Sequence, residues 1–168
     1  MAIFGTTYND FTDLLKHQLY DLNDAFVRMQ KSFGDMADKA TDRELSNLLT
    51  RAQSFADQHA EKLKDVFRMT GIEEGRETCE ATKGLVKEAS DTTSAGGDSD
   101  VIDAALVANA QRLAHYLIAG LGTVRNFSRR AGHPQAAEEL QSELDSWYGV
   151  DRDLTALAES RLNMEAVS

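Results

Sequence analysis

The chain has 168 residues, a length that suits one domain and can bury a sizeable core. Hydrophobic residues make up 42% of the sequence and charged residues 27%, which is typical of a globular protein rather than a disordered one. No apolar run reaches the length of a membrane span, so we expect a soluble protein without a membrane partner. The net charge of −10 also argues against nucleic acid and anionic lipid, because their phosphate groups repel an acidic surface.

The N-terminal residues, MAIFGTTYNDF, contain neither the basic segment nor the apolar segment of a secretory signal. We therefore expect a cytoplasmic protein that forms a single domain over residues 1–168. Cys79 is the one cysteine, so no internal disulfide can form, and no histidine-base pattern marks it as a nucleophile. We predict that it is a buried or half-buried structural thiol.

The first predicted helix spans residues 10–33. Its apolar residues are spaced by threes and fours, which is typical of an amphipathic helix, and Gly34 is suited to cap its C-terminal end. The inward-facing residues that this spacing predicts are Phe11, Leu15, Leu19, Leu22, Phe26, Met29 and Phe33.

The second predicted helix begins at Thr41, where Glu44 three residues later completes a capping box. It runs to about Thr70 and ends before Gly71. The residues predicted to face inward are Leu45, Leu48, Ala52, Phe55, His59, Leu63 and Val66.

A shorter helix is predicted over residues 79–89, and the small, polar stretch SDTTSAGGDSD that follows it predicts a crossover loop. The third long helix, over residues 100–131, is rich in apolar and small residues on most of its circumference. Small residues let a second helix approach closely, so we expect this helix to be central or to lie at a subunit contact. Its predicted inward residues are Leu106, Ala110, Leu113, Leu117, Leu121 and Val124.

Gly132, His133 and Pro134 predict a tight turn, with glycine closing one helix and proline opening the next. The final helix is expected to continue to about Met164. Four long helices, two tight turns and one crossover with a short extra helix predict an all-α, ferritin-like four-helix bundle. The residues predicted to face inward from the last helix are Ala137, Leu140, Leu144, Trp147, Asp151, Leu154 and Leu157.

A ferritin-like bundle raises the question of a di-metal site, which needs inward glutamates and Glu-x-x-His pairs. The sequence contains no Glu-x-x-His pair in these helices, since Ala56 precedes His59 and Arg112 precedes His115 at that spacing. The glutamates are instead predicted at helix starts or on outward faces, where they form a solvated charged surface. This prediction covers Glu44, Glu61, Glu138, Glu139 and Glu143.

A few polar residues are nonetheless predicted to face the interior, namely Asn23, His59, His115 and Asp151, with Tyr20 and Tyr116 nearby in the pattern. We interpret them mainly as hydrogen-bonded core residues, because buried polar groups are usually satisfied by neighbours. No glycine-rich phosphate loop, nucleophile elbow or zinc-spaced cluster is present, so the common enzyme motifs are absent.

Residues 101–124, VIDAALVANAQRLAHYLIAGLGTV, closely resemble the signature helix of the YciE/YciF family of stress-associated ferritin-like proteins. Further segments fall in the family order and extend the resemblance over about residues 11–158. The resemblance implies a ferritin-like bundle that packs as a homodimer, is linked to bacterial stress responses and has no well-defined enzymatic reaction. The further segments are LYDLNDA from Leu19, HAEKLKDVF from His59, CEATKGLVKEA from Cys79 and DRDLTALA from Asp151.

The chain departs from this family where carboxylates are usual. The replacements imply the loss of the negative charge that two cations need, and they remove the cost of desolvating unmetallated carboxylates. We therefore expect no metal and no cofactor. The residues at these positions are Asn23, Ser54, Phe55, Ala114, Leu117, Ser146 and Trp147, whereas His115, Tyr116, Asp145 and Asp151 remain.

The first hypothesis is therefore a non-catalytic, dimeric scaffold or interaction protein with a degenerate di-metal site. The alternative is a di-iron or di-manganese protein with oxidase or peroxide-scavenging activity, whose altered ligand set would be His59, His115 and Asp151 with Asp57 or Asp145. A module that binds a small apolar ligand between the helices is a third hypothesis. A protein or small-molecule partner beyond the second copy is not identified by the sequence.

Overall fold

The structure is a computed structural model that describes residues 7–167, and all the regular elements in that range are helices. An all-α fold is thereby confirmed. Residues 1–6, which carry most of the stretch examined for a secretory signal, and Ser168 lie outside the described residues. The helices are α1 (Phe11–Lys39), α2 (Arg43–Thr70), α3 (Glu80–Thr93), α4 (Ser99–Arg130), α5 (Pro134–Leu157), the π-helical turn η1 (Ala158–Leu162) and α6 (Asn163–Glu165).

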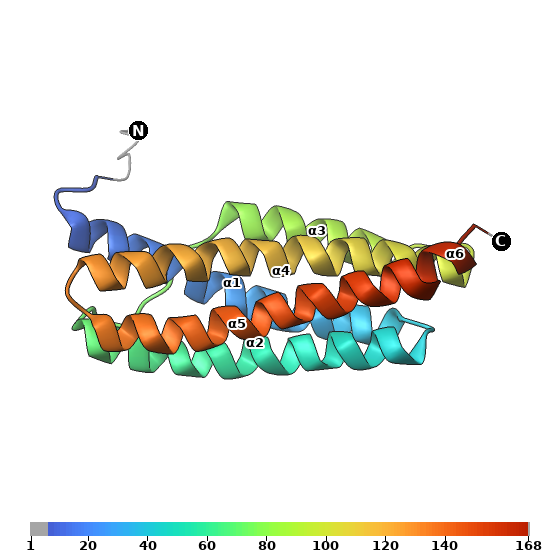
Figure 1. The fold of residues 1–168 in the computed structure, drawn as a ribbon. Helices are drawn as coiled ribbons and strands as arrows, with labels where there is room; N and C mark the ends of the chain where they lie inside the picture. The colour runs from blue at the N-terminus through green and yellow to red at the C-terminus, as the bar shows by residue number, and fades with distance from the viewer. Residues whose placement is uncertain (1–6, 168) are drawn as a thin grey trace, which may run out of the picture.

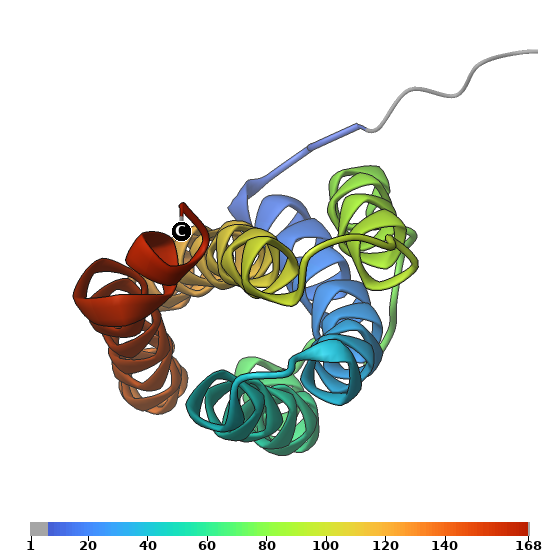
Figure 2. The same ribbon diagram turned by 90° about the vertical axis from the view of Figure 1, so that its right-hand side faces the viewer.

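Four long helices run side by side and form an elongated bundle (Figure 1). Helix α1 packs against α2 and α4, and α5 closes the bundle by packing against α4 and α2. The shorter α3 lies outside this bundle, against α1 and α4, as the view along the helix axes shows (Figure 2). The crossover from α2 to α4 therefore carries a short extra helix, as the sequence predicts.

No helix in the range 7–167 is long and apolar enough to span a membrane. The hydrophobic core lies between α1, α2, α4 and α5 and is built largely from the predicted stripes, but Phe11, predicted to face inward, is 39% exposed. All six residues of the stripe predicted for α4 are buried. Of the stripe predicted for α2, Leu48 and Phe55 are only partly buried, because Leu49 and Ala56 take the more central positions.

Helix α1 continues past the predicted end at Gly34 because its apolar stripe continues with Met36 and Ala37, both of which are buried. Gly34 is not a cap. A Cβ atom at this position would lie 2.6 Å from the Gln53 Nε2 atom, so glycine leaves room for the end of the Gln53 side chain.

The start of α2 is also displaced from the prediction by one residue. The N-cap is Asp42, whose carboxylate accepts a hydrogen bond from the Leu45 N–H at 2.9 Å. Thr41 instead turns toward α4, where its backbone N–H and its hydroxyl donate to the Asp103 carboxylate at 3.0 and 2.8 Å. The predicted C-terminal cap is confirmed, since Gly71 adopts the left-handed conformation with φ of 69°.

The two remaining differences concern helix ends. Helix α3 extends to Thr93, further than predicted, because Asn109 of α4 donates a hydrogen bond to the Thr92 hydroxyl at 2.7 Å and holds this last turn. At the other end of the chain, the predicted final helix is α-helical only to Leu157, and the π-helical turn η1 follows. Pro134 opens α5 as predicted.

Candidate functional site

The centre of the bundle contains a polar cluster of three side chains, His59 from α2 with Glu143 and Trp147 from α5. Glu143 and Trp147 are four residues apart, so they share one face of α5 and both point toward His59. The Trp147 Nε1–H donates a hydrogen bond to the His59 Nδ1 atom at 3.0 Å. A Glu143 carboxyl oxygen lies 3.8 Å from the same nitrogen. All three side chains are buried.

Aromatic rings enclose this cluster. Phe55 stacks on the His59 ring with the planes 1° apart, and Phe26 meets the same ring edge-on with the centroids at 5.9 Å. Phe33 stacks on Trp147 at 5.6 Å. Aromatic pairs at these separations are attractive, so the middle of the bundle is held by ring contacts. Side chains therefore fill the space between the helices around the His59 Nδ1 atom, which already accepts a hydrogen bond from Trp147.

Burial sets the charge state of the cluster. Desolvation, assisted by nearby Lys62, lowers the pKa of His59 to about 4, because a charged imidazolium is unfavourable in an apolar surrounding. Desolvation also raises the pKa of Glu143 to about 8, with Lys62 opposing and Glu139 reinforcing the shift. Both groups are therefore neutral near pH 7, and their proximity is not an ion pair.

The structure corrects the prediction for Glu143, which the sequence placed on an outward face. Its side chain is 0% exposed. The position lies three residues after Leu140 and four before Trp147, both of which are buried, so the helical spacing alone would place it on the inner face. The residue type concealed this signal, because an unpaired glutamate is seldom buried.

The predicted inward position of His115 is wrong. Its side chain is 63% exposed and pairs with Asp151 at 3.1 Å, while Asp151 also accepts a hydrogen bond from Gln111 at 3.1 Å. The Asp151 side chain is 22% exposed, so it lies at the edge of the core rather than within it. His115 lies two residues from Leu113 and two from Leu117, which belong to the buried stripe, so helical spacing alone places it on the opposite side of α4.

The altered ligand set of the metal hypothesis is thus not assembled. His59 contacts Trp147 and Glu143 in the core, whereas His115 and Asp151 pair at the surface. Asp57 and Asp145 are exposed, and each accepts a hydrogen bond from a glutamine, Gln30 and Gln141 respectively.

Asn23, also predicted to face inward, is partly buried and holds the connection between α2 and α3. Its side-chain amide donates to the Gly75 carbonyl at 2.9 Å. Tyr20 acts similarly, since its hydroxyl donates to the Glu73 carbonyl at 3.1 Å. Both side chains therefore fix a loop and do not contribute to the central cluster.

Cys79 is 2% exposed, which confirms the predicted buried thiol. Its sulfur caps α3 by accepting hydrogen bonds from the Thr82 N–H at 3.3 Å and the Thr82 hydroxyl at 2.9 Å. The Tyr116 hydroxyl lies 2.8 Å from the sulfur and donates to Asp21 at 2.6 Å. The thiol therefore links α3 to α4 and, through Tyr116, to α1.

A di-metal centre requires several anionic oxygens. Between residues 7 and 167, no group of three or more His, Cys, Asp or Glu side chains is arranged to hold a metal ion. At the centre, one carboxyl and one imidazole meet, and the tryptophan N–H occupies the imidazole Nδ1 lone pair. These residues do not fit a di-metal group.

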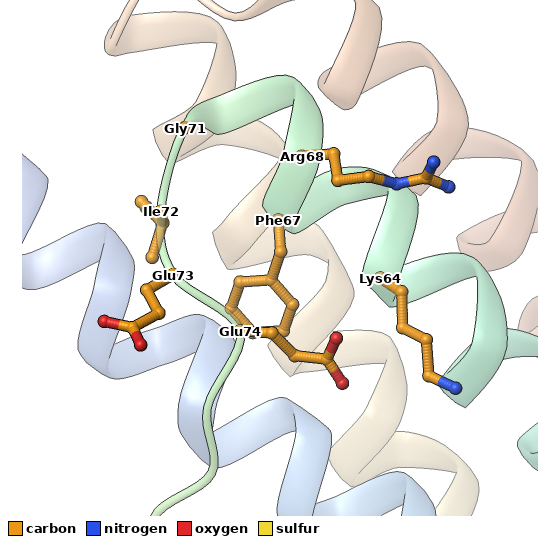
Figure 3. A pocket seen from close by; sticks show the side chains of 7 residues that line it. All are labelled: Lys64, Phe67, Arg68, Gly71, Ile72, Glu73 and Glu74. Carbon is orange, nitrogen blue, oxygen red and sulfur yellow. The ribbon is translucent and has the colours of Figure 1, made fainter.

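A surface hollow of about 590 Å³ lies where α2 ends and its connection to α3 begins (Figure 3). Its cationic side chains, Lys64 and Arg68, extend away from the loop that carries Glu73 and Glu74. Each is already paired with an acidic residue one turn earlier, Glu61 and Asp65. The hollow therefore lacks the convergent polar groups of a binding site.

The helix order, the bundle and its external crossover helix define the class as ferritin-like helical proteins. Residues 10–167 match a family described as a domain of unknown function, DUF892. The chain belongs to this family. The resemblance inferred from the sequence is confirmed by a curated relative, Protein YciF of Escherichia coli strain K12, which is 28% identical over 155 residues and is matched over 92% of this chain and 93% of its own length.

Two solved structures have the same fold. The crystal structure of the Escherichia coli stress protein YciF superimposes with a TM-score of 0.89 at 27% identity, covering 93% of this chain and 99% of that one. YcfI from Rhodopseudomonas palustris, described as a candidate structural protein, superimposes with a TM-score of 0.86 at 32% identity, covering 94% of this chain and 99% of that one.

Proposed function

We propose that this chain is a non-catalytic, stress-associated cytoplasmic protein that acts as a homodimeric scaffold or interaction protein and whose di-metal site is degenerate. The observation that carries the proposal is the Trp147–His59 hydrogen bond at 3.0 Å in the centre of the bundle. A metal ligand must offer its lone pair to the ion, and here the His59 Nδ1 lone pair is bound to a neighbouring N–H.

The surroundings of this bond support the same proposal. Glu143 is the one carboxyl that lies beside His59 in this cluster, whereas a di-metal centre requires several anionic oxygens. The Escherichia coli relative is called a stress protein and the Rhodopseudomonas palustris relative a candidate structural protein, which is consistent with a role without catalysis.

We expect the purified protein to contain well under one iron or manganese ion per chain after extensive dialysis, because the central residues are aromatic or neutral. Inductively coupled plasma mass spectrometry of the dialysed protein, expressed with added iron and manganese, measures this directly. A Trp147→Phe variant removes the N–H from His59 and is the matched control for occupancy of that nitrogen. Stoichiometric metal in the wild-type protein would overturn the proposal.

The homodimer is inferred from the outward face of α4. Ala119 is exposed, Ala108 is half-buried, and Val101 on the same helix is 50% exposed. The same face also carries the exposed side chains of Arg112 and His115. Its small and apolar residues are suited to the close approach of a second helix, and a symmetric second copy is the commonest partner of this kind. The acidic net charge of −10 makes nucleic acid a poor alternative occupant.

We expect a dimer at micromolar concentration, measured by light scattering behind size exclusion. The mass of the Ala119→Glu variant in solution should lie closer to that of one 18.5 kDa chain than the wild-type mass does, because the substitution places a charge in the proposed contact. Ser142→Glu, at an exposed position of α5, is the matched control and should leave the mass unchanged. A wild-type mass of one chain across the micromolar range would refute the dimer.

A further inference from the structure

The buried carboxyl groups of the bundle differ in how they are satisfied. Asp24 accepts hydrogen bonds from Arg28 at 2.5 Å and from the Cys79 N–H at 2.9 Å. Asp103 accepts hydrogen bonds from the Thr41 N–H and hydroxyl and from the Asp42 N–H, at 2.7 to 3.0 Å. Both carboxylates therefore enter the core with donors that stabilise their charge.

Glu143 has no such donor. Its side chain is 0% exposed, and both of its carboxyl oxygens are buried without a hydrogen-bond partner. The nearest polar atom of the cluster, the His59 Nδ1 at 3.8 Å, cannot donate to Glu143, since it accepts a hydrogen bond from the Trp147 Nε1–H. An ionised carboxylate in this position would be left without compensation, which is far less favourable than a neutral carboxylic acid.

We propose that Glu143 is protonated in the folded bundle and makes the contact between α5 and α2 sensitive to alkali, so that removal of this proton loosens the packing around Trp147. The other titratable groups near Glu143 are His59 and Lys62 of α2 and Glu139 of α5. Lys62 pairs with Glu139 at 3.1 Å, which limits its ability to neutralise Glu143. On α1 and α4, the buried titratable groups are Asp24 and Asp103, and each is engaged with its own donors.

The pH window follows from the two titrations. Folding raises the pKa of Glu143 from 4.5 to about 8, so its stabilising effect is complete below pH 4.5 and is lost as the pH rises to about 8. Folding lowers the pKa of His59 from 6.5 to about 4, so its effect is present above pH 6.5 and is lost as the pH falls. Between pH 4.5 and 6.5 the two effects cancel, because the folded state holds one proton on Glu143 and the unfolded state holds one proton on His59.

Above pH 6.5 only the folded state holds this proton. The equilibrium constant for unfolding should therefore rise about 15-fold in total between pH 6.5 and 8 through Glu143, with the slope flattening toward pH 8 as the folded state loses the proton, in addition to any background from other groups. Denaturant unfolding of the full chain, followed by Trp147 fluorescence over this range, measures the slope. Glu143→Gln, which imitates the neutral acid, should lose this extra slope, whereas Glu138→Gln, at an exposed position five residues earlier, should retain it.

Two further measurements test the protonation of Glu143 and the contact between α5 and α2 separately. Infrared spectroscopy of the wild-type protein at pH 6.5 should show the carbonyl stretch of a buried carboxylic acid, absent from Glu143→Gln and lost well above pH 8. Above pH 8, hydrogen exchange at the Trp147 indole N–H should be faster in the wild type than in Glu143→Gln. An equal slope in the wild type and Glu143→Gln, absence of the acid band, or equal indole exchange would overturn the proposal. The infrared measurement on the wild type decides the protonation if Glu143→Gln does not fold.

Discussion

Replacing Trp147 with alanine is expected to lower the free energy of unfolding by about 3–5 kcal/mol. The side chain is 0% exposed, stacks on Phe33 and donates to His59, so its removal leaves a cavity and an unsatisfied imidazole nitrogen. Denaturant unfolding monitored by circular dichroism gives the value. The adjacent Tyr148→Ala, at a residue that is 51% exposed, is the control and should change stability by no more than about 0.5 kcal/mol.

Trp147→Phe separates the two contributions of this side chain. Phenylalanine retains an aromatic ring against Phe33 but cannot donate to His59, so a smaller loss is expected than for alanine. A loss below about 1 kcal/mol for Trp147→Ala would be typical of a surface substitution and would contradict the buried cluster.

Asp103→Ala is expected to cost about 2–4 kcal/mol, because its carboxylate receives three hydrogen bonds from the turn between α1 and α2. This carboxylate is 1% exposed and connects α4 to that turn, whose residues Thr41 and Asp42 lie 62 and 61 positions earlier in the chain. Thermal or denaturant unfolding measures the loss. Asp100→Ala, at an exposed position in the first turn of α4, should cost less than about 1 kcal/mol. Equal costs for the two variants would show that the hydrogen bonds to the turn contribute little.

The sequence was sufficient to predict the bundle because its helices carry strong apolar periodicity and clear caps. Gly71 and Pro134 end and begin helices where predicted, and Trp147 lies in the core where its spacing placed it. Gly34 was predicted to end the first helix, but α1 continues through it because Met36 and Ala37 extend the buried stripe. A glycine inside a helix looks the same in sequence as a glycine that ends one.

The central site was only partly predictable. His59 lies inward as expected, but the predictions for two other residues are wrong. Glu143 was predicted to face outward and lies in the core, and His115 was predicted to face inward and lies at the surface. Helical spacing favoured an inward Glu143, yet residue type favoured the surface. The hydrogen bond from Trp147 to His59 joins residues 88 positions apart and depends on how α2 and α5 align, which periodicity within one helix does not specify.

We propose that aromatic packing and the Trp147–His59 hydrogen bond take the place of a di-metal centre in this bundle. The most direct test is a crystal structure of protein purified without a chelator and soaked in iron or manganese, with data collected at the absorption edge of each metal. We predict no anomalous peak beside His59 or Glu143 and an intact bond from the Trp147 Nε1–H to the His59 Nδ1 atom. An anomalous peak bound to either His59 or Glu143, with Trp147 displaced, would contradict the account.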